Sequence, residues 1–148
     1  MRKVLIIGAG GIGSFLIPLL KKTGLYSITV ADPDIVEKKN LPYQNYGEED
    51  IGDNKASLMH TRFKLKACIP HKILTTKQME GFDLVISCVD NLSLRRTMYR
   101  SKLSWLDLRA QGRNAAFISS ESSPDMWDTM LAGPEGSFSC QGDSWDGS

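Results

Sequence analysis

Apolar and polar positions follow a strand, helix, strand order over the first 31 residues. Residues 4–7 are four branched aliphatic side chains in a row, which is typical of a strand buried on both faces of a sheet. Apolar side chains then recur at helical spacing and predict a helix over residues 11–23, closed by Gly24. Residues 27–31 predict a second strand. This order indicates a parallel α/β unit.

The rest of the chain continues the alternation. A helix is expected to begin at an Asp53 or Asn54 N-cap and to keep one apolar face through Ala67. Later elements are expected at residues 72–75 (strand), 82–88 (strand), 91–102 (helix), 105–109 (strand) and 114–120 (strand). We therefore predict an α/β, Rossmann-like fold, a mostly parallel sheet flanked by helices, with residues 4–7 at its centre. Residues 1–120 would form this domain, and residues 121–148 an irregular C-terminal tail.

The junction between the first strand and the first helix carries glycines at positions 8, 10 and 13. In this G-x-G-x-x-G pattern, Gly8 permits a tight turn, Gly10 lets the backbone approach a phosphate, and Gly13 lets the helix pack closely on the strand. The N–H groups and dipole of the new helix favour an anion. Asp32 ends the second strand, where an acidic side chain can bind ribose hydroxyls. The pattern predicts nucleotide binding, with a ligand-free tight turn as the alternative.

Composition narrows the class of protein. The 148 residues suit one domain, and 18 Lys and Arg against 17 Asp and Glu give no reason to expect a nucleic-acid partner. Cys68, Cys88 and Cys140 form no C-x-x-C, so neither a disulfide framework nor a zinc site is expected, and Cys140 is read as a plain thiol. Cysteines without a disulfide pattern favour a location in the reducing cytoplasm. No apolar run is long enough to span a membrane, and no membrane partner is expected.

Two charged residues have positions that suggest chemistry. Lys55 falls in the first turn of a predicted helix, where a cation opposes the helix dipole, so helix stability does not explain it. Asp90 follows the strand over residues 82–88, at the same sheet edge as the glycine loop, and could hold a magnesium ion. The simpler alternatives are a solvated surface lysine and a helix N-cap.

Four blocks of sequence together resemble the ThiF/MoeB-type adenylation domain, the family that includes the activating enzymes for ubiquitin-like proteins. They read G-A-G-G-I-G-S, A-D-P-D-I-V-E-K-K-N-L-P-Y-Q, D-I-G-D-N-K-A and C-V-D-N-L-S-L-R, within residues 3–120. The resemblance implies an ATP-dependent adenylyltransferase that activates the C-terminal glycine carboxylate of a ubiquitin-like carrier protein or peptide. It also implies ATP and Mg2+ as cofactors and a homodimer.

The resemblance assigns roles to individual residues. Asp90, Lys55 and Arg95 would be catalytic, and Asp90 would hold the metal. The nucleotide would be bound by Gly8, Gly10, Gly11, Gly13, Asp32, Asp34, Asn40, Gln44 and Lys55. Two of these have a simpler alternative: Asn40 can be a turn residue, and Arg95 a surface ion-pair former.

The sequence also departs from the family pattern. Tyr43 stands where the family has an arginine that contacts the ATP phosphates, and the chain starts at its first strand, without the family's preceding arginine-bearing helical segment. Each such arginine is worth on the order of 10³-fold in phosphoryl chemistry. Arg96, Arg109 and Arg113 are candidates to compensate.

These departures keep two alternatives open. One is a catalytically inactive nucleotide- or protein-binding module of the same fold. The other is an NAD-dependent oxidoreductase, which fits the glycines and Asp32 but leaves Lys55 and Asp90 without a role.

Overall fold

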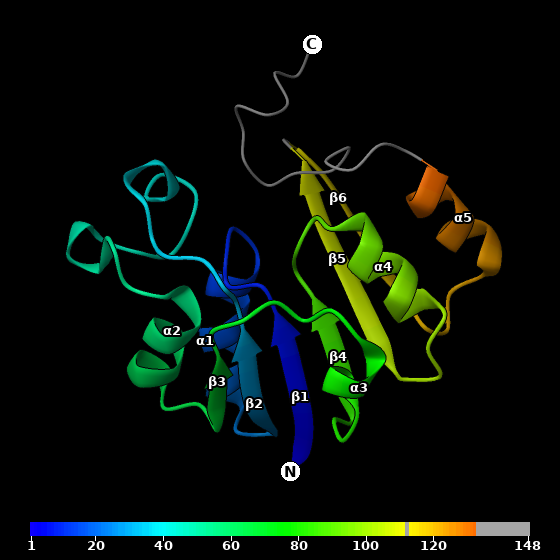
Figure 1. Cartoon of the computed structure of the whole chain (residues 1–148), viewed down its shortest axis with the longest axis horizontal. Helices are drawn as coiled ribbons and strands as arrows, with labels where there is room; N and C mark the ends of the chain where they lie inside the picture. Colours follow the sequence, from blue (N-terminus) through cyan, green and yellow to red (C-terminus); the bar gives the residue numbers. More distant parts are fainter. Residues whose placement is uncertain (112, 133–148) are drawn as a thin grey trace.

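A six-stranded sheet forms the centre of the molecule (Figure 1). The computed structural model describes residues 1–111 and 113–132. The strands lie in the order β3-β2-β1-β4-β5-β6, and their bounds are Arg2–Ile7 (β1), Tyr26–Ala31 (β2), Ala67–Ile69 (β3), Leu84–Ser87 (β4), Trp105–Gln111 (β5) and Asn114–Ser119 (β6). The first five strands are parallel, and β6 is antiparallel to β5. The Rossmann-like fold class is confirmed, with β1 central.

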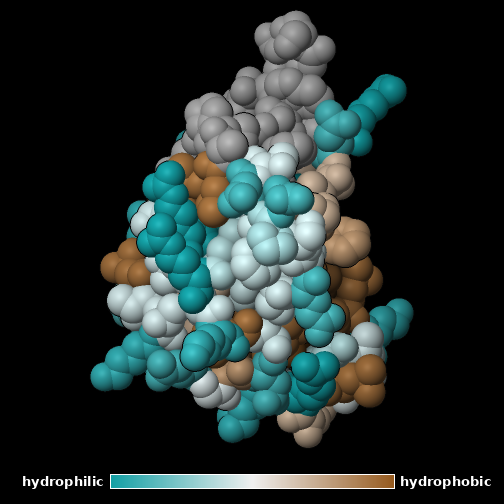
Figure 2. Space-filling view, turned by 90° about the vertical axis from the view of Figure 1, so that its right-hand side faces the viewer, coloured by the Kyte–Doolittle hydropathy of each residue, from teal (hydrophilic) through white to brown (hydrophobic). Residues whose placement is uncertain are grey.

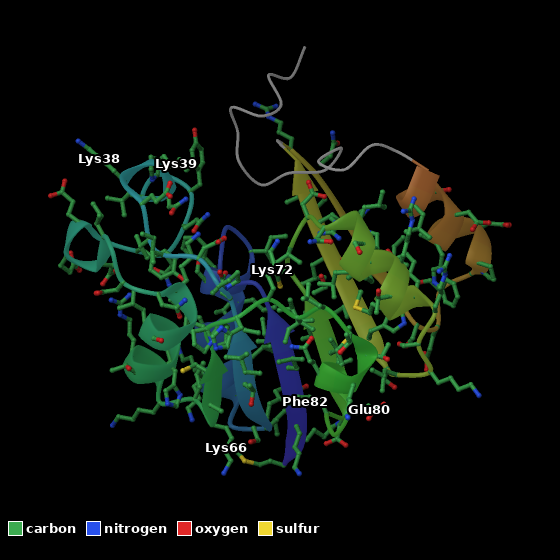
Figure 3. All side chains as sticks on the ribbon, in the orientation of Figure 1. Lys38, Lys39, Lys66, Lys72, Glu80 and Phe82 are labelled. Carbon is green, nitrogen blue, oxygen red and sulfur yellow. The ribbon has the colours of Figure 1, made fainter. Side chains whose placement is uncertain are left out.

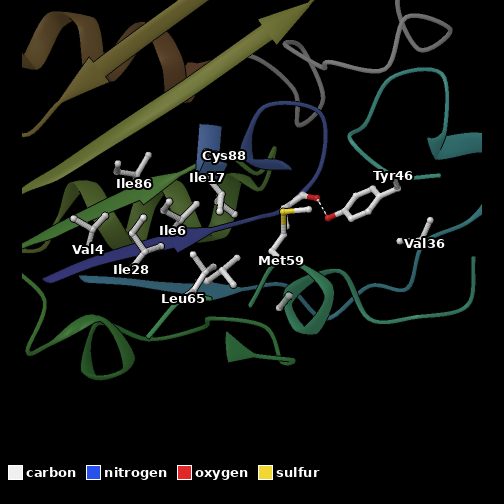
Figure 4. Packing of buried hydrophobic residues seen from close by; sticks show 13 residues of the cluster. Val4, Ile6, Ile17, Ile28, Val36, Tyr46, Met59, Leu65, Ile86 and Cys88 are labelled. Carbon is white, nitrogen blue, oxygen red and sulfur yellow. Dashed lines mark hydrogen bonds between the residues drawn. The ribbon is translucent and has the colours of Figure 1, made fainter. Parts of the chain in front are cut away.

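Helices cover both faces of this sheet (Figure 1). Their bounds are Gly13–Thr23 (α1), Lys55–Phe63 (α2), Thr76–Met79 (α3), Leu92–Tyr99 (α4) and Pro124–Ala132 (α5). Val4 and Ile6 pack with α1 and α2, as Figure 4 shows in part, whereas Leu5 and Ile7 pack with α3, α4 and α5. Successive strand side chains point to opposite faces, so four consecutive aliphatic residues serve both layers.

The strand register brings the functional loops to one edge. Ile7 lies opposite Ala31 of β2 and Ser87 of β4, so these three strands end at the same level. The glycine loop, Asp32 and the segment through Asp90 therefore leave the sheet side by side at its carboxyl edge. Helix ends agree with the sequence at Gly24, whose φ is 71°, and at Asn54, whose side chain accepts a hydrogen bond from the Ser57 N–H.

The predicted strand over residues 72–75 is wrong. Helix α2 ends at Phe63, Lys64 follows in a left-handed conformation, and Ala67 begins β3 rather than extending the helical face. Pairing beside Thr29 of β2 selects this strand, and such long-range pairing leaves no local pattern in the sequence.

Part of the predicted irregular tail is helical. Helix α5 packs on α4, where the Trp127 ring lies 6.0 Å from Tyr99 and 5.6 Å from Trp105, and its indole N–H donates to the Ser119 carbonyl. The half-buried Trp127 side chain packs on an existing core and holds this helix against α4. Around α5, the surface seen in Figure 2 has intermediate hydropathy at its centre, with hydrophilic and apolar residues toward its margins. The boundary at residue 120 stays a prediction, and Cys140 lies outside the described residues.

Within the described ranges, no helix combines the length and the apolar character that crossing a membrane requires.

Candidate nucleotide-binding site

A cleft of about 350 Å³ opens at the carboxyl edge of the sheet. It brings together most of the predicted site residues, namely Gly8, Gly10, Gly11, Asp32, Asp34, Gln44, Lys55 and Asp90. Gly13, Asn40 and Arg95 do not line it. An adjoining hollow shares Pro33, Asp34 and Lys55 with the cleft and also includes Asn40.

Two glycines of the loop are required by geometry. Gly8 has a φ of 100°, and a Cβ atom there would lie 2.4 Å from the Val89 side chain. A Cβ atom on Gly13 would lie 1.8 Å from the Gly8 carbonyl oxygen, so only glycine allows α1 to start this close to β1. Gly10 faces the Gln44 amide and leaves the backbone of the loop accessible. The loop therefore makes the tight turn that the glycine spacing predicts, and phosphate binding by its backbone stays a prediction.

Asp32 is buried and holds the glycine loop. Its Oδ2 accepts a 2.8 Å hydrogen bond from the Ala9 N–H, and its Oδ1 accepts one of 2.8 Å from the Asp34 N–H. Burial raises the pKa of the Asp32 carboxyl, and these two N–H groups oppose the shift. Each oxygen keeps acceptor capacity toward the cleft, so the geometry is compatible with ribose binding and adds a structural role.

A second loop clamps the glycine loop from the other side, and sequence reasoning missed it. The Tyr46 hydroxyl donates a 2.6 Å hydrogen bond to the Ala9 carbonyl (Figure 4). The Asn45 N–H donates to the Ser14 hydroxyl, and its amide donates to the Ser14 carbonyl. The only sequence signal was an aromatic residue in an otherwise polar connection.

Lys55 is a buried cation at the edge of the cleft. Its residue is 6% exposed, it opens α2, and its N–H donates to the Asp34 carbonyl. In the described part of the chain, its ammonium forms no hydrogen bond or ion pair, although Asp32 lies close enough to interact electrostatically. A buried cation without a contacting counter-charge is costly, and a ligand anion would offset that cost. The alternative of a solvated surface lysine does not fit this burial.

Gln44 and Asn40 occupy the loop that faces Lys55. The Gln44 side chain is buried, and within the described residues its Oε1 has no hydrogen-bond partner. Such an unsatisfied acceptor at a cleft wall suits a ligand donor. Asn40 is also buried, but its Oδ1 accepts from the Glu37 N–H and closes a short 3-10 turn. The turn role is therefore observed, and Asn40 faces the adjoining hollow.

Asp90 lines the cleft beside the helix that Asn91 caps. The Asn91 side chain accepts from the Leu94 N–H, so the N-cap reading of Asp90 is wrong. The Asp90 Oδ1 pairs with the Arg95 guanidinium at 3.3 Å, and the carboxylate remains 25% exposed. Arg95 is neither a surface residue nor a lining residue, because it is buried behind Asp90. Its place fits a positioning role better than direct contact with a nucleotide.

Behind Asp90 lies a buried network of charges that the sequence reading did not identify. Asp107 of β5 pairs with Arg95 and with Arg109, and it accepts a hydrogen bond from the Tyr99 hydroxyl. Burial raises the pKa of Asp107, while Arg109, Tyr99 and Arg95 oppose the shift. Arg109 also donates to the Val89 carbonyl and lines the cleft. The alternation of polar residues in D-L-R was the available signal.

The segment after β3 forms part of the wall of the cleft. His71, Lys72 and Ile73 line it, although this stretch was predicted as a strand. Lys72 lies above the strand ends, whereas Lys38 and Lys39 point away from the sheet (Figure 3). Residues 71–73 therefore line the site as a loop and not as a strand.

The sequence matches the ThiF family over residues 1–104. SUMO-activating enzyme subunit 2 of Dictyostelium discoideum is 33% identical, over 69% of this chain and 17% of that protein. Adenylyltransferase and sulfurtransferase UBA4 of Yarrowia lipolytica is 32% identical, over 64% of this chain and 26% of that protein. Molybdopterin-synthase adenylyltransferase of Salmonella typhimurium is 28% identical, over 82% of this chain and 56% of that protein. The chain thus spans only part of the length of these relatives.

Solved structures support the same fold. E. coli MccB with ATP superposes with a TM-score of 0.71 at 23% identity, over 79% of this chain and 40% of that one. The TM-score is 0.64 for E. coli tRNA N6-threonylcarbamoyladenosine dehydratase, TcdA, in complex with ATP. That match has 23% identity and covers 75% of this chain and 51% of the other. Both of these neighbours are complexes with ATP.

Proposed function

Because the chain belongs to the ThiF family, we propose that it binds ATP in this cleft and transfers AMP to the C-terminal carboxylate of a ubiquitin-like carrier protein or peptide. One observation carries the proposal. The buried Lys55 ammonium, without an ion-pair partner in the described part, shares a cleft with a glycine loop and the Asp90 carboxylate. A cation and a metal-binding carboxylate beside a phosphate cradle suit phosphoryl chemistry and give a hydride-transfer enzyme no evident advantage.

The nucleotide would lie along the half of the cleft nearest β2. The loop from Gly8 to Gly11 would bind phosphates through backbone N–H groups, and Lys55 would neutralise phosphate charge. Asp32 would bind ribose hydroxyls with the acceptor capacity that its two backbone hydrogen bonds leave. The unpaired Gln44 Oε1 would accept a hydrogen bond from the ligand.

A magnesium ion would be held by Asp90. The described residues contain no cluster of three or more His, Cys, Asp or Glu side chains that could enclose a metal. One carboxylate together with nucleotide phosphates is nevertheless an ordinary way of binding Mg2+. The partly exposed Asp90 carboxylate, held by Arg95, fits that arrangement. When bound, the ion would supply electrostatic stabilisation of the charge on the transferred phosphoryl group.

The relatives suggest the acceptor. Their names include a SUMO-activating enzyme subunit and a molybdopterin-synthase adenylyltransferase, and one solved MccB structure contains AMPCPP and MccA. A ubiquitin-like carrier or a peptide with a C-terminal glycine is therefore the acceptor that we propose. A homodimer and a cytoplasmic location, which the family resemblance and the cysteine usage favour, belong to the same proposal.

One observation favours a second candidate, an inactive nucleotide- or protein-binding module. Tyr43 replaces the family's phosphate-contacting arginine, is 43% exposed and does not line the cleft. The cation that it replaces could be worth on the order of 10³-fold in rate. Such a module would still bind the nucleotide but would not transfer AMP.

ATP–pyrophosphate exchange with carriers and peptides that end in Gly-Gly tests the activity, and thermal unfolding with ATP and magnesium, AMP or NAD tests binding. Ligand at 100 times its Kd stabilises the fold by about 2.7 kcal/mol. Exchange that depends on an acceptor supports the enzyme. ATP stabilisation with no exchange supports the inactive module, and stabilisation by NAD alone would overturn both. Sedimentation with ATP present tests the dimer.

A further inference from the structure

The connection between β2 and α2 is closed at its base and reaches the glycine loop with its tip. At the base, Ile35 forms a bridge with Asn54. At the tip, Gln44 lines the cleft, and the Tyr46 hydroxyl donates to the Ala9 carbonyl (Figure 4). A loop tip is more mobile than the elements that the loop connects, so closure at the base does not fix the tip. The tip needs a contact of its own.

Arg62 of α2 supplies such a contact through a buried carboxylate. The Arg62 Nη2 lies 2.7 Å from the Asp50 Oδ1, and Asp50 is 3% exposed. The other oxygen of this carboxylate, Oδ2, accepts a 2.9 Å hydrogen bond from the Gly47 N–H. Gly47 directly follows Tyr46 in the chain. Asp50 therefore joins α2 to the part of the tip that holds the glycine loop.

Arg62 and Asp50 can influence a nucleotide only indirectly, because neither residue lines the cleft. An ion pair between exposed side chains contributes little to stability, but a carboxylate as buried as Asp50 is costly once its cation is removed. Without Arg62, the tip is expected to move so that water can reach the Asp50 carboxylate. Gln44 and Tyr46 would then move with it, away from the glycine loop.

We propose that Arg62 is a positioning residue for the nucleotide, because through Asp50 it keeps Gln44 at the cleft and Tyr46 on the glycine loop. The inference rests on the proposed function, since it places the nucleotide at the glycine loop. It assigns part of the nucleotide affinity to an ion pair that does not touch the ligand.

Titration calorimetry with AMPCPP and magnesium tests this role in Arg62→Met, in Gln44→Ala and in the double variant. Each single variant is expected to bind AMPCPP about two- to tenfold more weakly, the size of one hydrogen bond. Because Arg62 acts in part through the position of Gln44, the loss in the double variant should be smaller than the product of the two single losses. Lys66→Met removes an exposed cation beyond the end of α2 and should leave the affinity unchanged (Figure 3).

Hydrogen exchange without nucleotide tests the same role independently of ligand binding. In Arg62→Met, the amides of residues 8–14 and 44–50 should exchange faster, and by a larger factor than the amides of β4. A loss of stability alone would instead accelerate exchange in all buried segments alike. If Arg62→Met does not fold, the charge-balanced variant Asp50→Asn with Arg62→Met takes its place, with the same expected result.

Three results would overturn the inference: unchanged AMPCPP affinity in a folded Arg62 variant, single losses that multiply in the double variant, or a uniform rise in exchange. An equal loss of affinity in Lys66→Met would also overturn it, because any nearby cation would then have the same effect. Failure of the wild type to bind AMPCPP would count against the proposed function, while the exchange of residues 8–14 would still decide on Arg62.

Discussion

The Asp32 carboxylate ties the end of β2 to the glycine loop, because its Oδ2 accepts a 2.8 Å hydrogen bond from the Ala9 N–H. The loop that cradles phosphates is therefore held by the residue proposed to bind the ribose. Because the Asp32 side chain serves both the fold and the ligand, its contributions to stability and to ATP affinity must be measured on the same variant.

Asp32→Ala is expected to weaken ATP binding several-fold and also to lower the free energy of unfolding by about 1–3 kcal/mol, since the Ala9 and Asp34 N–H groups lose their acceptor. Titration calorimetry and urea denaturation measure the two effects. Asp53→Ala removes an exposed carboxylate from the same region and should change neither. Unchanged affinity in a destabilised Asp32→Ala protein would limit Asp32 to its structural role.

Tyr46→Phe tests the second clamp. The substitution leaves the buried Ala9 carbonyl without the hydroxyl that donates to it at 2.6 Å, so the unfolding free energy should fall by about 1–2 kcal/mol. Tyr43→Phe removes an exposed hydroxyl from the same loop and should cost almost nothing. Equal stabilities of the two variants in urea would contradict the clamp.

The sequence predicts those parts of the site that depend on local geometry. Gly8 and Gly13 belong to a turn whose shape is set within six residues, and Asp32 and Asp90 follow apolar strands whose ends must meet at one edge. The central place of β1 follows in the same way from a run of residues that is apolar on both faces.

The sequence does not predict features that depend on long-range packing. Whether Arg95 faces solvent or Asp107 is decided by the contact between α4 and β5, and no local pattern reveals that contact. The strand expected at residues 72–75 is wrong for the same reason, because β3 is selected by its pairing with β2. The sequence identifies Arg109 as a candidate to replace a missing arginine, but it does not predict where the Arg109 side chain points.

Lys55→Met should separate ligand binding from stability. Removing a buried cation that opposes the dipole of α2 is expected to leave the unfolding free energy unchanged or to raise it by up to about 1 kcal/mol. ATP affinity should fall by about tenfold or more, because phosphate charge loses its buried counter-ion. Lys38→Met removes an exposed lysine that points away from the sheet and serves as the control (Figure 3). A large loss of stability in Lys55→Met would indicate a structural ion pair.

Asp50 should make the free energy of unfolding depend on pH in the acid range. Burial alone would raise the pKa of its carboxyl, but the Gly47 N–H and Arg62 lower it below the ordinary value of 3.8. A lowered pKa in the folded state means that Asp50 stabilises the protein above about pH 4 and that this contribution is lost as the pH falls further.

The stability difference between the wild type and Asp50→Asn, measured by urea denaturation, should therefore be constant from pH 7 to pH 5 and shrink below pH 4. A difference for Asp50→Asn that grows on acidification would reverse the assigned sign.

Asp90→Asn addresses the proposed metal site. Asparagine is a much poorer ligand for Mg2+ than aspartate, so magnesium-dependent ATP binding and any pyrophosphate exchange should be lost. The fold should survive, because Asn91 rather than Asp90 caps α4 and Arg95 keeps its contact with Asp107. Asn91→Ala is the matched control, and it should lower stability by about 1 kcal/mol without changing the magnesium dependence.

The two variants together separate the alternatives for this corner of the cleft. Full magnesium dependence in Asp90→Asn would move the metal site elsewhere, even if the protein is an adenylyltransferase. Unfolding of Asp90→Asn would instead mean that the 3.3 Å pair with Asp90 is required to keep Arg95 of α4 in its buried contact with Asp107 of β5. If the wild type binds ATP without any response to magnesium, Asp90 serves only to fix Arg95, and the site is that of a binding module.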